Sequence, residues 1–302
     1  MKKKKIHLFL RKSIKNEHFS IENFYSELFQ DFKSTKYKIK FLKCPVSSNG
    51  FIKRLYLIFW AYFNQGDINH VLGDINFISF FFSKKKTINT ILDLFSLKRV
   101  SGIKKYLYYW FWIRLPINRS YKIITISNKI KTELIYNTNI SRKKIKVIDV
   151  CISKRFQTVN KKNLKKIPQI LIIGTSLNKN IFNSLSALQG INCKLVIIGN
   201  LNNNYINQLK ELKIQYKNYA GISNGQIIKI YKDTDILLFA SKYEGFGIPI
   251  LEAQKTGIPV VTSKIDPMKY VAGKGAILVN PYKVKSIKDG LENIINNKKL
   301  KK

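Results

Sequence analysis

Short apolar runs alternate with amphipathic stretches along the second half of the chain, and this alternation most limits what the chain can fold into. The runs predicted as strands are 169–173, 194–198, 235–240, 259–262 and 276–279. The stretches with helical periodicity between them are 181–188, 205–212, 225–231, 249–255 and 284–295. Strand and helix in regular succession predict a parallel sheet that helices cover on both faces.

The first half repeats this alternation less regularly. Its predicted strands are 6–10, 37–42, 68–72, 87–91, 123–126 and 145–150, and its predicted helices are 21–32, 52–63, 103–113 and 129–136. A polar, lysine-rich linker over 157–166 separates the halves, so the sequence predicts two Rossmann-like, doubly wound α/β domains, residues 1–156 and 167–302. Because ligands bind at the carboxyl ends of such sheets, we expect a central cleft and an enzyme with two substrates.

The net charge of +38 is large, but the lysines are spread along the chain. Abundant lysine, isoleucine and asparagine together indicate compositional drift of the whole sequence. The alternative is peripheral contact with an anionic membrane, through the Lys2–Lys5 run and the aromatic, basic stretch Lys104–Arg119. A nucleic-acid partner is not expected, because no basic face carries a recognition motif.

The apolar windows 55–63 and 107–113 are shorter than the roughly 20 residues that a membrane-spanning helix needs. The apolar run after the lysine-rich start is also too short for a signal peptide. Cys44, Cys151 and Cys193 have no metal-type spacing and are expected to be reduced. We therefore expect a cytoplasmic protein, with peripheral contact with the inner membrane face as an open alternative.

The stretch SKYEGFGIPILEA, Ser241–Ala253, carries the clearest functional pattern. Glu244, Gly245, Phe246 and Gly247 form a predicted turn between a buried strand and a helix. The two glycines let backbone approach a ligand, and free amides at a helix start favour a diphosphate. Glu244 and Glu252 can both point into one crevice and accept hydrogen bonds from sugar hydroxyls. Amides for a diphosphate and carboxylates for two sugars are the groups that a nucleotide sugar requires. The alternative is a common glycine-rich turn with two solvated acids.

The longer stretch YEGFGIPILEAQKTGIPVVTS resembles the nucleotide-sugar half of the retaining glycosyltransferases of group 1 (family 4), which have the GT-B fold. ILIIGTSLNKN, with Gly174, Thr175 and Lys179, is similar to the first strand and phosphate loop of that half. The segment around Gly221 is similar to the family segment that lies beside the base of the nucleotide. The resemblance covers Ile170 to about Ile295. It implies that Lys179 faces the diphosphate, Glu244 holds the transferred sugar and Glu252 holds the ribose.

A weaker resemblance covers about Leu8 to Phe156, in stretches such as INHVLGDINFISFFF and IKVIDVCISKRF. It implies that His70, Gly73 and Asp74 line the acceptor side of the cleft, with Asp93 near them. The alternative for His70 is a histidine of the core or surface.

Three features depart from the family pattern. Thr175 stands where many members have an arginine, and Leu92 stands where a histidine usually precedes the aspartate. The chain also stops before such proteins commonly end, so we expect a truncated second domain without the helix that braces the first.

The sequence thus predicts a retaining glycosyltransferase that moves a sugar from a nucleoside-diphosphate sugar to a glycan or lipid-linked acceptor in cell-surface polysaccharide synthesis. Lys179 and Glu244 are the predicted catalytic residues. No cofactor or metal is expected, because no Asp-x-Asp stands at a strand end and Lys179, backbone amides and a helix dipole can stabilise the leaving diphosphate. The alternative is a degenerate, non-catalytic relative that binds nucleotide sugars, motivated by the three departures.

Overall fold

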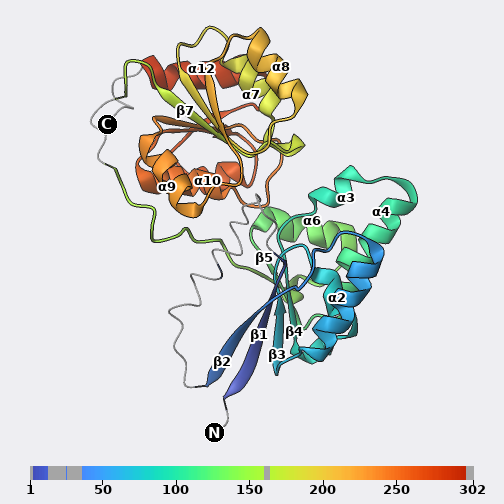
Figure 1. The fold of residues 1–302 in the computed structure, drawn as a ribbon. Helices are drawn as coiled ribbons and strands as arrows, with labels where there is room; N and C mark the ends of the chain where they lie inside the picture. The colour runs from blue at the N-terminus through green and yellow to red at the C-terminus, as the bar shows by residue number, and fades with distance from the viewer. Residues whose placement is uncertain (1–2, 13–24, 26–35, 160–163, 297–302) are drawn as a thin grey trace. The chain divides into compact units, whose positions relative to one another are not determined.

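The computed structural model describes residues 3–12, 25, 36–159 and 164–296, which form two compact units (Figure 1). Within the described residues, the first unit extends to Cys151 and the second begins at Ile152. The helix predicted over 21–32 lies outside the described residues, apart from Tyr25. No helix in the described part is long and apolar enough to cross a membrane.

The second unit is built on a six-stranded parallel sheet with the order β12-β11-β10-β7-β8-β9. Its strands are β7 (Gln169–Ile173), β8 (Lys194–Ile198), β9 (Tyr216–Tyr219), β10 (Ile236–Phe239), β11 (Val260–Ser263) and β12 (Ile277–Val279). Its α-helices are α7 (Ile181–Ala187), α8 (Asn203–Glu211), α9 (Asn224–Asp233), α10 (Ile248–Thr256), α11 (Met268–Ala272) and α12 (Val284–Asn296). The strand order reverses between β7 and β10, so the sheet is doubly wound as predicted.

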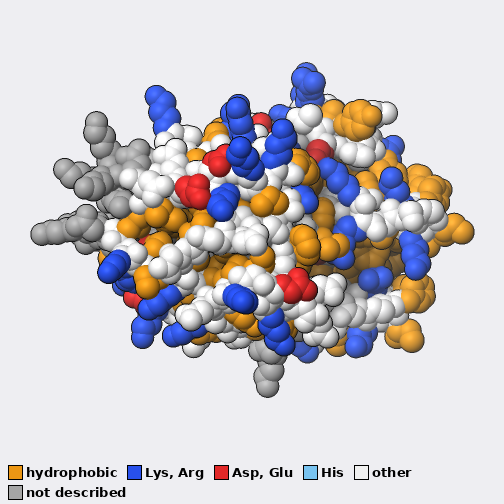
Figure 2. Space-filling view, turned by 90° about the horizontal axis from the view of Figure 1, so that it is seen from above, with side chains coloured by type: hydrophobic (Ala, Val, Ile, Leu, Met, Phe, Trp, Pro, Cys, Tyr) orange, Lys and Arg blue, Asp and Glu red, His pale blue; other side chains and the backbone are white. Residues whose placement is uncertain are grey.

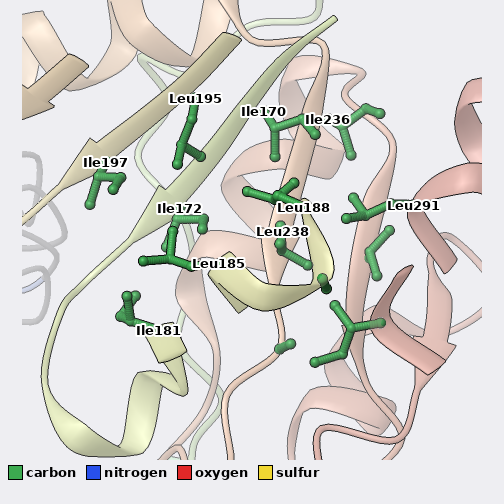
Figure 3. Packing of buried hydrophobic residues seen from close by; sticks show 14 of the residues in the cluster. Ile170, Ile172, Ile181, Leu185, Leu188, Leu195, Ile197, Ile236, Leu238 and Leu291 are labelled. Carbon is green, nitrogen blue, oxygen red and sulfur yellow. The ribbon is translucent and has the colours of Figure 1, made fainter. Parts of the chain in front are cut away.

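Successive residues of the strands pack into two separate cores. Ile170 and Ile172 lie in the core that α7, α8 and α12 cover, as Figure 3 shows for Leu185, Leu188 and Leu291. Leu171, between them, points to the opposite face, where α9, α10 and α11 pack. Because both faces are buried, the strands read as continuous apolar runs, which is why the sequence predicts most of them.

The first unit has a six-stranded parallel sheet with the order β2-β1-β3-β4-β5-β6. Its strands are β1 (Lys4–Leu10), β2 (Tyr37–Lys43), β3 (Ile68–Val71), β4 (Thr87–Ile91), β5 (Lys122–Thr125) and β6 (Ile145–Val147). Its described helices are α2 (Phe51–Phe63), α3 (Phe95–Arg99), α4 (Gly102–Tyr108), α5 (Leu115–Asn118) and α6 (Asn128–Thr138). The 3-10 helix η1 (Asn76–Phe81) follows β3, and the π-helical turn η3 (Tyr109–Arg114) joins α4 to α5.

The segment before β7 packs against the second unit. From the sequence, the first domain is predicted to end at residue 156, but the Phe156 ring lies edge-on to Tyr231, with 5.2 Å between ring centroids, in the core of the second unit. In the predicted linker, Val159 N donates to Thr256 O at 3.0 Å. The stretch from Phe156 to Val159 is therefore attached to the second unit.

Candidate functional site

The predicted donor residues gather where β7 and β10 end. These two strands are neighbours at the point where the strand order of the second sheet reverses. The loops that follow neighbouring strands at such a point diverge to opposite faces and leave a crevice at the carboxyl ends. Gly174 and Lys179 follow β7, while Glu244 and Gly247 follow β10. The fold alone thus brings together residues that are far apart in the chain.

Lys179 and Glu244 form the centre of this group. Lys179 Nζ donates to Glu244 Oε1 at 2.7 Å, and the two side chains are only 19% and 12% exposed. The same Nζ lies 4.8 Å from the centroid of the Phe239 ring, at the end of β10. Restricted contact with water strengthens the field of this ammonium group relative to an exposed lysine.

Gly174 makes room for the lysine. Its φ of +84° is one that glycine adopts without strain, and a Cβ at this position would lie 2.7 Å from Lys179 Cε. The lysine side chain therefore crosses the glycine backbone on its way to Glu244. This contact gives a physical reason for a glycine immediately after β7.

Two asparagines connect the loop after β7 to the loop after β10. Asn178 Nδ2 donates to Tyr243 O at 2.9 Å, and Asn178 O accepts from Lys242 N at 2.8 Å. Asn180 is buried in the left-handed conformation, and its Nδ2 donates to Ala240 O at 3.0 Å. Neither asparagine was predicted as a positioning residue, although an asparagine directly before a predicted helix indicates such a turn.

The start of α10 follows the loop that carries Glu244. Gly247 precedes the helix with φ +111°, and Pro249 lies in the first turn. No side chain caps this end, and the buried Phe246 ring fixes the turn that leads into it. Pro249 has no N–H and Ile250 N donates to Gly247 O at 3.0 Å, so it is the positive end of the helix dipole that favours an anion here, a diphosphate included.

Glu252 lies further along α10 and contacts α9. Tyr231 Oη donates to Glu252 Oε2 at 2.6 Å, and the tyrosine is fully buried. Burial raises the pKa of the Glu252 carboxyl to about 7, although the hydrogen bond from Tyr231 opposes the shift. Tyr231 was missed in the sequence analysis; the signal available was a tyrosine on the buried face of a helix, because its hydroxyl requires a partner.

Thr175 and Gly221 border the same edge of the sheet. A Cβ on Gly199, after β8, would lie 2.9 Å from Thr175 Oγ1, so the threonine packs against that glycine. Gly221 follows β9 with φ +65°. Thr175 offers a hydroxyl where an arginine was expected, which leaves Lys179 as the cation of this loop.

His70 is a buried residue of β3. It is 8% exposed, its Nε2 lies 2.8 Å from Thr90 Oγ1, and its ring packs edge-on against Tyr25. Burial lowers its pKa to about 4. Gly73 follows β3 with φ +80°. The geometry favours the core-histidine alternative over a histidine that lines an open site.

Asp74 and Asp93 lie near each other at the carboxyl edge of the first sheet. Asp74 forms an ion pair with Arg11 NH1 at 3.3 Å, and Asp93 Oδ1 accepts from Phe95 N at 2.8 Å. Both carboxylates act on Tyr108, whose pKa is raised to about 12, mainly by burial and further by these charges. Arg11 was missed, although a basic residue directly after β1 shares this edge.

Metal-binding groups are absent from the described residues: no cluster of three or more His, Cys, Asp or Glu side chains forms there. The one sequence of Asp-x-Asp form at the start of a strand, Asp233–Asp235, precedes β10 at its amino end, away from the site. Asp235 Oδ2 accepts from Gln169 N at 2.8 Å and thereby joins two strands.

The family model of the glycosyl transferases group 1 matches residues 154–302. The carboxyl-terminal half of the chain belongs to the group 1 glycosyl transferases. The matched half contains Gly174, Lys179, Glu244 and Glu252, so the residues predicted to bind the donor lie within it, whereas His70, Gly73, Asp74 and Asp93 lie outside it.

Curated relatives of this group 1 chain include the O-antigen chain mannosyltransferase RfbU of Salmonella typhimurium, which is 27% identical over 200 residues, 62% of this chain and 54% of the relative. The capsular polysaccharide biosynthesis glycosyltransferase CapM of Staphylococcus aureus is 26% identical over 228 residues, 68% and 60% of the two chains. The chain thus spans little more than half the length of these relatives.

Solved structures show that the group 1 chain has the GT-B fold. HepE of Anabaena, solved in complex with UDP and glucose, has a TM-score of 0.75 and 14% identity, over 99% of this chain and 91% of that one. WaaG, a glycosyltransferase involved in lipopolysaccharide biosynthesis, has a TM-score of 0.72 and 12% identity, over 98% and 92%. The expected fold class, two Rossmann-like α/β domains, is confirmed.

Proposed function

We propose that the chain is a glycosyltransferase that moves a sugar from a nucleoside-diphosphate sugar to a glycan or lipid-linked acceptor, with retention of configuration, in cell-surface polysaccharide synthesis. It works on the cytoplasmic side. The observation that carries the proposal is the Lys179–Glu244 pair, at 2.7 Å, beside the uncapped start of α10. Family membership of the same segment and the names of its relatives support the reaction class.

Diphosphate departure is the step that the site assists. The bond between the anomeric carbon and the diphosphate oxygen breaks, the acceptor hydroxyl oxygen forms the new glycosidic bond, and its proton is released. Negative charge builds up on the diphosphate as the bond breaks. The Lys179 ammonium group and the positive end of the α10 dipole stabilise that charge, because both lie at the carboxyl edge of the sheet, where the diphosphate binds in this proposal.

The two glutamates have different roles in the proposal. Glu244 exchanges its contact with Lys179 for hydroxyl groups of the transferred sugar when the diphosphate takes over the ammonium group. Glu252 keeps its hydrogen bond from Tyr231 through Oε2 and offers Oε1 to the ribose hydroxyls. Transfer needs no metal ion, so activity is expected to persist in the presence of EDTA.

The acceptor binds to the first unit, at the edge that carries Gly73, Asp74 and Asp93. Arg11 fixes the Asp74 carboxylate there, and the Tyr108 ring stacks on Trp112 with 5.2 Å between centroids. Carboxylates and stacked aromatic rings are suited to the hydroxyl groups and apolar faces of a sugar ring. His70 supports this edge from within the sheet, through Thr90.

A panel of UDP-, GDP- and ADP-sugars tests the proposal, with binding measured by thermal shift and turnover by release of nucleoside diphosphate. We expect stabilisation by one nucleotide class and slow donor hydrolysis. Glu252→Ala is expected mainly to weaken nucleotide binding, and Glu244→Ala mainly to lower turnover. Equal wild-type activity in both variants would refute the assignment.

A non-catalytic binding protein is the second candidate. Thr175 packs against Gly199 in place of the expected arginine, and Leu92 replaces the expected histidine, so two groups that could assist transfer are missing from these positions. In the same panel, nucleotide binding without hydrolysis or transfer to any acceptor would favour this candidate.

A further inference from the structure

Helix α2 has an apolar outer face. Its core-facing residues are Leu57, Ile58 and Ala61. Its exposed large side chains are Phe51, Ile52, Leu55, Tyr56, Phe59, Tyr62 and Phe63. Ile52 is 82% exposed and Phe63 is 80% exposed. A surface helix of a water-soluble domain normally turns polar residues outward, so this face needs a partner that is itself apolar.

The segment that contains α4 and η3 repeats this property. Its exposed large side chains are Ile103, Tyr106, Leu107, Trp110 and Phe111. Side-chain contacts connect it to α2: the Arg54 guanidinium lies 4.6 Å from the Trp112 ring centroid, and Trp112 packs on Phe77 of η1 at 5.1 Å. Phe81 at the end of η1 in turn packs on Phe59, at 5.7 Å. We call the exposed side chains of α2, η1, α4 and η3 the outer face; Figure 1 shows α2 and α4 on one side of the first sheet.

Basic residues surround the outer face, and acidic residues are absent from its helices. Lys53, Lys104 and Lys105 are exposed between the apolar side chains, and the exposed run Lys84–Lys86 follows η1. Neither 51–63 nor 102–118 contains an aspartate or a glutamate. In the view from above Figure 1, lysine and arginine side chains outnumber acidic ones over the surface, so the excess of positive charge is not confined to the outer face (Figure 2).

We infer that the outer face docks on the surface of an anionic lipid bilayer, with its aromatic and aliphatic side chains at the level of the headgroups and its lysines on the anionic phosphates. Apolar helix faces with tyrosine, tryptophan and flanking lysine are typical of interfacial helices. Protein interfaces, in contrast, are depleted in lysine. The inference goes beyond the proposed reaction and does not depend on it, because no residue of the outer face belongs to the donor site.

Vesicle flotation with the full chain tests the inference, using phosphatidylcholine vesicles with and without phosphatidylglycerol. We expect the protein to float with the anionic vesicles. Ile52→Ser/Phe63→Ser should lower the partition coefficient at least tenfold, because two large side chains leave the lipid. Tyr121→Ser/Tyr136→Ser is the matched control, since both tyrosines are exposed on other elements of the same unit, and its partitioning should match the wild type.

Charge variants separate the electrostatic contribution. Lys104→Gln/Lys105→Gln should lower binding to anionic vesicles about 30-fold, because each basic residue near the surface contributes about fivefold in affinity. Binding to neutral vesicles should not change. Lys210→Gln/Lys217→Gln removes the same charge from exposed positions in the second unit and should change binding less than threefold. Unchanged thermal unfolding of all four variants would show that they retain the fold.

Three results would overturn the inference. The first is a wild-type protein that stays with the soluble fraction at every lipid composition. The second is equal loss of binding in the Ile52→Ser/Phe63→Ser variant and in its tyrosine control, which would indicate non-specific adsorption. The third is a dimer, seen by light scattering, that Ile52→Ser/Phe63→Ser abolishes in a protein that does not bind vesicles; the outer face would then bind a second copy of the chain.

Discussion

The two domains use the same doubly wound sheet for different purposes. In the second domain, polar side chains from loops far apart in the chain meet at the carboxyl edge, as Lys179 and Glu244 do at 2.7 Å. In the first domain, the corresponding edge holds residues whose polar groups bind neighbours, such as His70 with Thr90 and Asp93 with Phe95 N. Its distinctive feature is instead the apolar outer face. The feature that distinguishes the second domain is thus a poorly exposed charged pair, and the feature that distinguishes the first is an exposed apolar surface.

Removing the positive charge of the proposed donor site should give the largest effect. We expect Lys179→Ala to lower the turnover of donor hydrolysis or transfer about 100- to 1000-fold, because it removes one pre-oriented cation from the leaving diphosphate. Steady-state release of nucleoside diphosphate measures this change.

Lys242→Ala is the matched control for that substitution. Lys242 is also partly buried, and its Nζ lies 5.6 Å from the Tyr282 ring, but it does not contact Glu244. Its turnover should stay within threefold of the wild type. If both variants lose activity equally, the effect comes from general loss of positive charge and the comparison between the domains fails.

The second prediction concerns the pH dependence of stability. Glu252 in the second domain and His70 in the first are buried titratable groups, and their pKa values are shifted in opposite directions. The native pKa of Glu252, about 7, lies above its ordinary value of 4.5, so its contribution to stability is full below pH 4.5 and is lost as the pH rises through 7. The native pKa of His70, about 4, lies below its ordinary 6.5, so its contribution is full above pH 6.5 and is lost as the pH falls through 4.

Neutral substitutions reveal these slopes. The free energy of unfolding of the wild type relative to Glu252→Gln should fall by about 3 kcal/mol between pH 4.5 and 8, and relative to His70→Asn it should rise by a similar amount between pH 4 and 7. Urea unfolding at each pH gives both quantities. Parallel curves for wild type and variant would mean that the carboxyl or imidazole group is solvated rather than buried.

Elements that are buried on both faces could be predicted from the sequence. Elements that are exposed, and contacts between residues far apart in the chain, could not. The apolar strands β7, β8, β10 and β11 were predicted within one residue at each end, because both faces of the sheet are buried. The edge strand β9, with the polar sequence YKNY, carries no such pattern and was not predicted. In place of the single helix predicted over 103–113, the structure has α4 followed by a π-helical turn. The spacing of apolar residues does not reveal where the backbone hydrogen bonds change from the α-helical to the π-helical pattern.

The site divides in the same way. A glycine-rich turn before α10 could be argued from local sequence. The contact of Lys179 with Glu244 spans 65 positions and was not predicted; the resemblance implied only that both residues bind the donor. The contact of Tyr231 with Glu252 required the packing of α9 on α10, which no local pattern contains.

The third prediction separates backbone strain from the space that the site requires. Gly174 and Gly273 both have positive φ, but a Cβ on Gly273 meets nothing within 4 Å, while one on Gly174 lies 2.7 Å from Lys179 Cε. Both Gly→Ala substitutions should therefore cost about 1 kcal/mol of stability through strain. Only Gly174→Ala should also lower turnover, by about tenfold, because the lysine is displaced. Chemical unfolding and donor hydrolysis measure the two effects, and equal turnover in both variants would mean that the loop adapts.

The smallest effect is expected in the first domain, where Asp74 is 67% exposed in its ion pair with Arg11. Asp74→Asn removes the charge but keeps the shape, and exposed ion pairs contribute about 0–1 kcal/mol, so the free energy of unfolding should change by less than about 0.5 kcal/mol. If this edge binds the acceptor, the acceptor KM should rise a few-fold while donor hydrolysis without acceptor stays unchanged. A fall in donor hydrolysis equal to the loss of transfer would place Asp74 with the donor site, and the division of labour between the two domains would no longer hold.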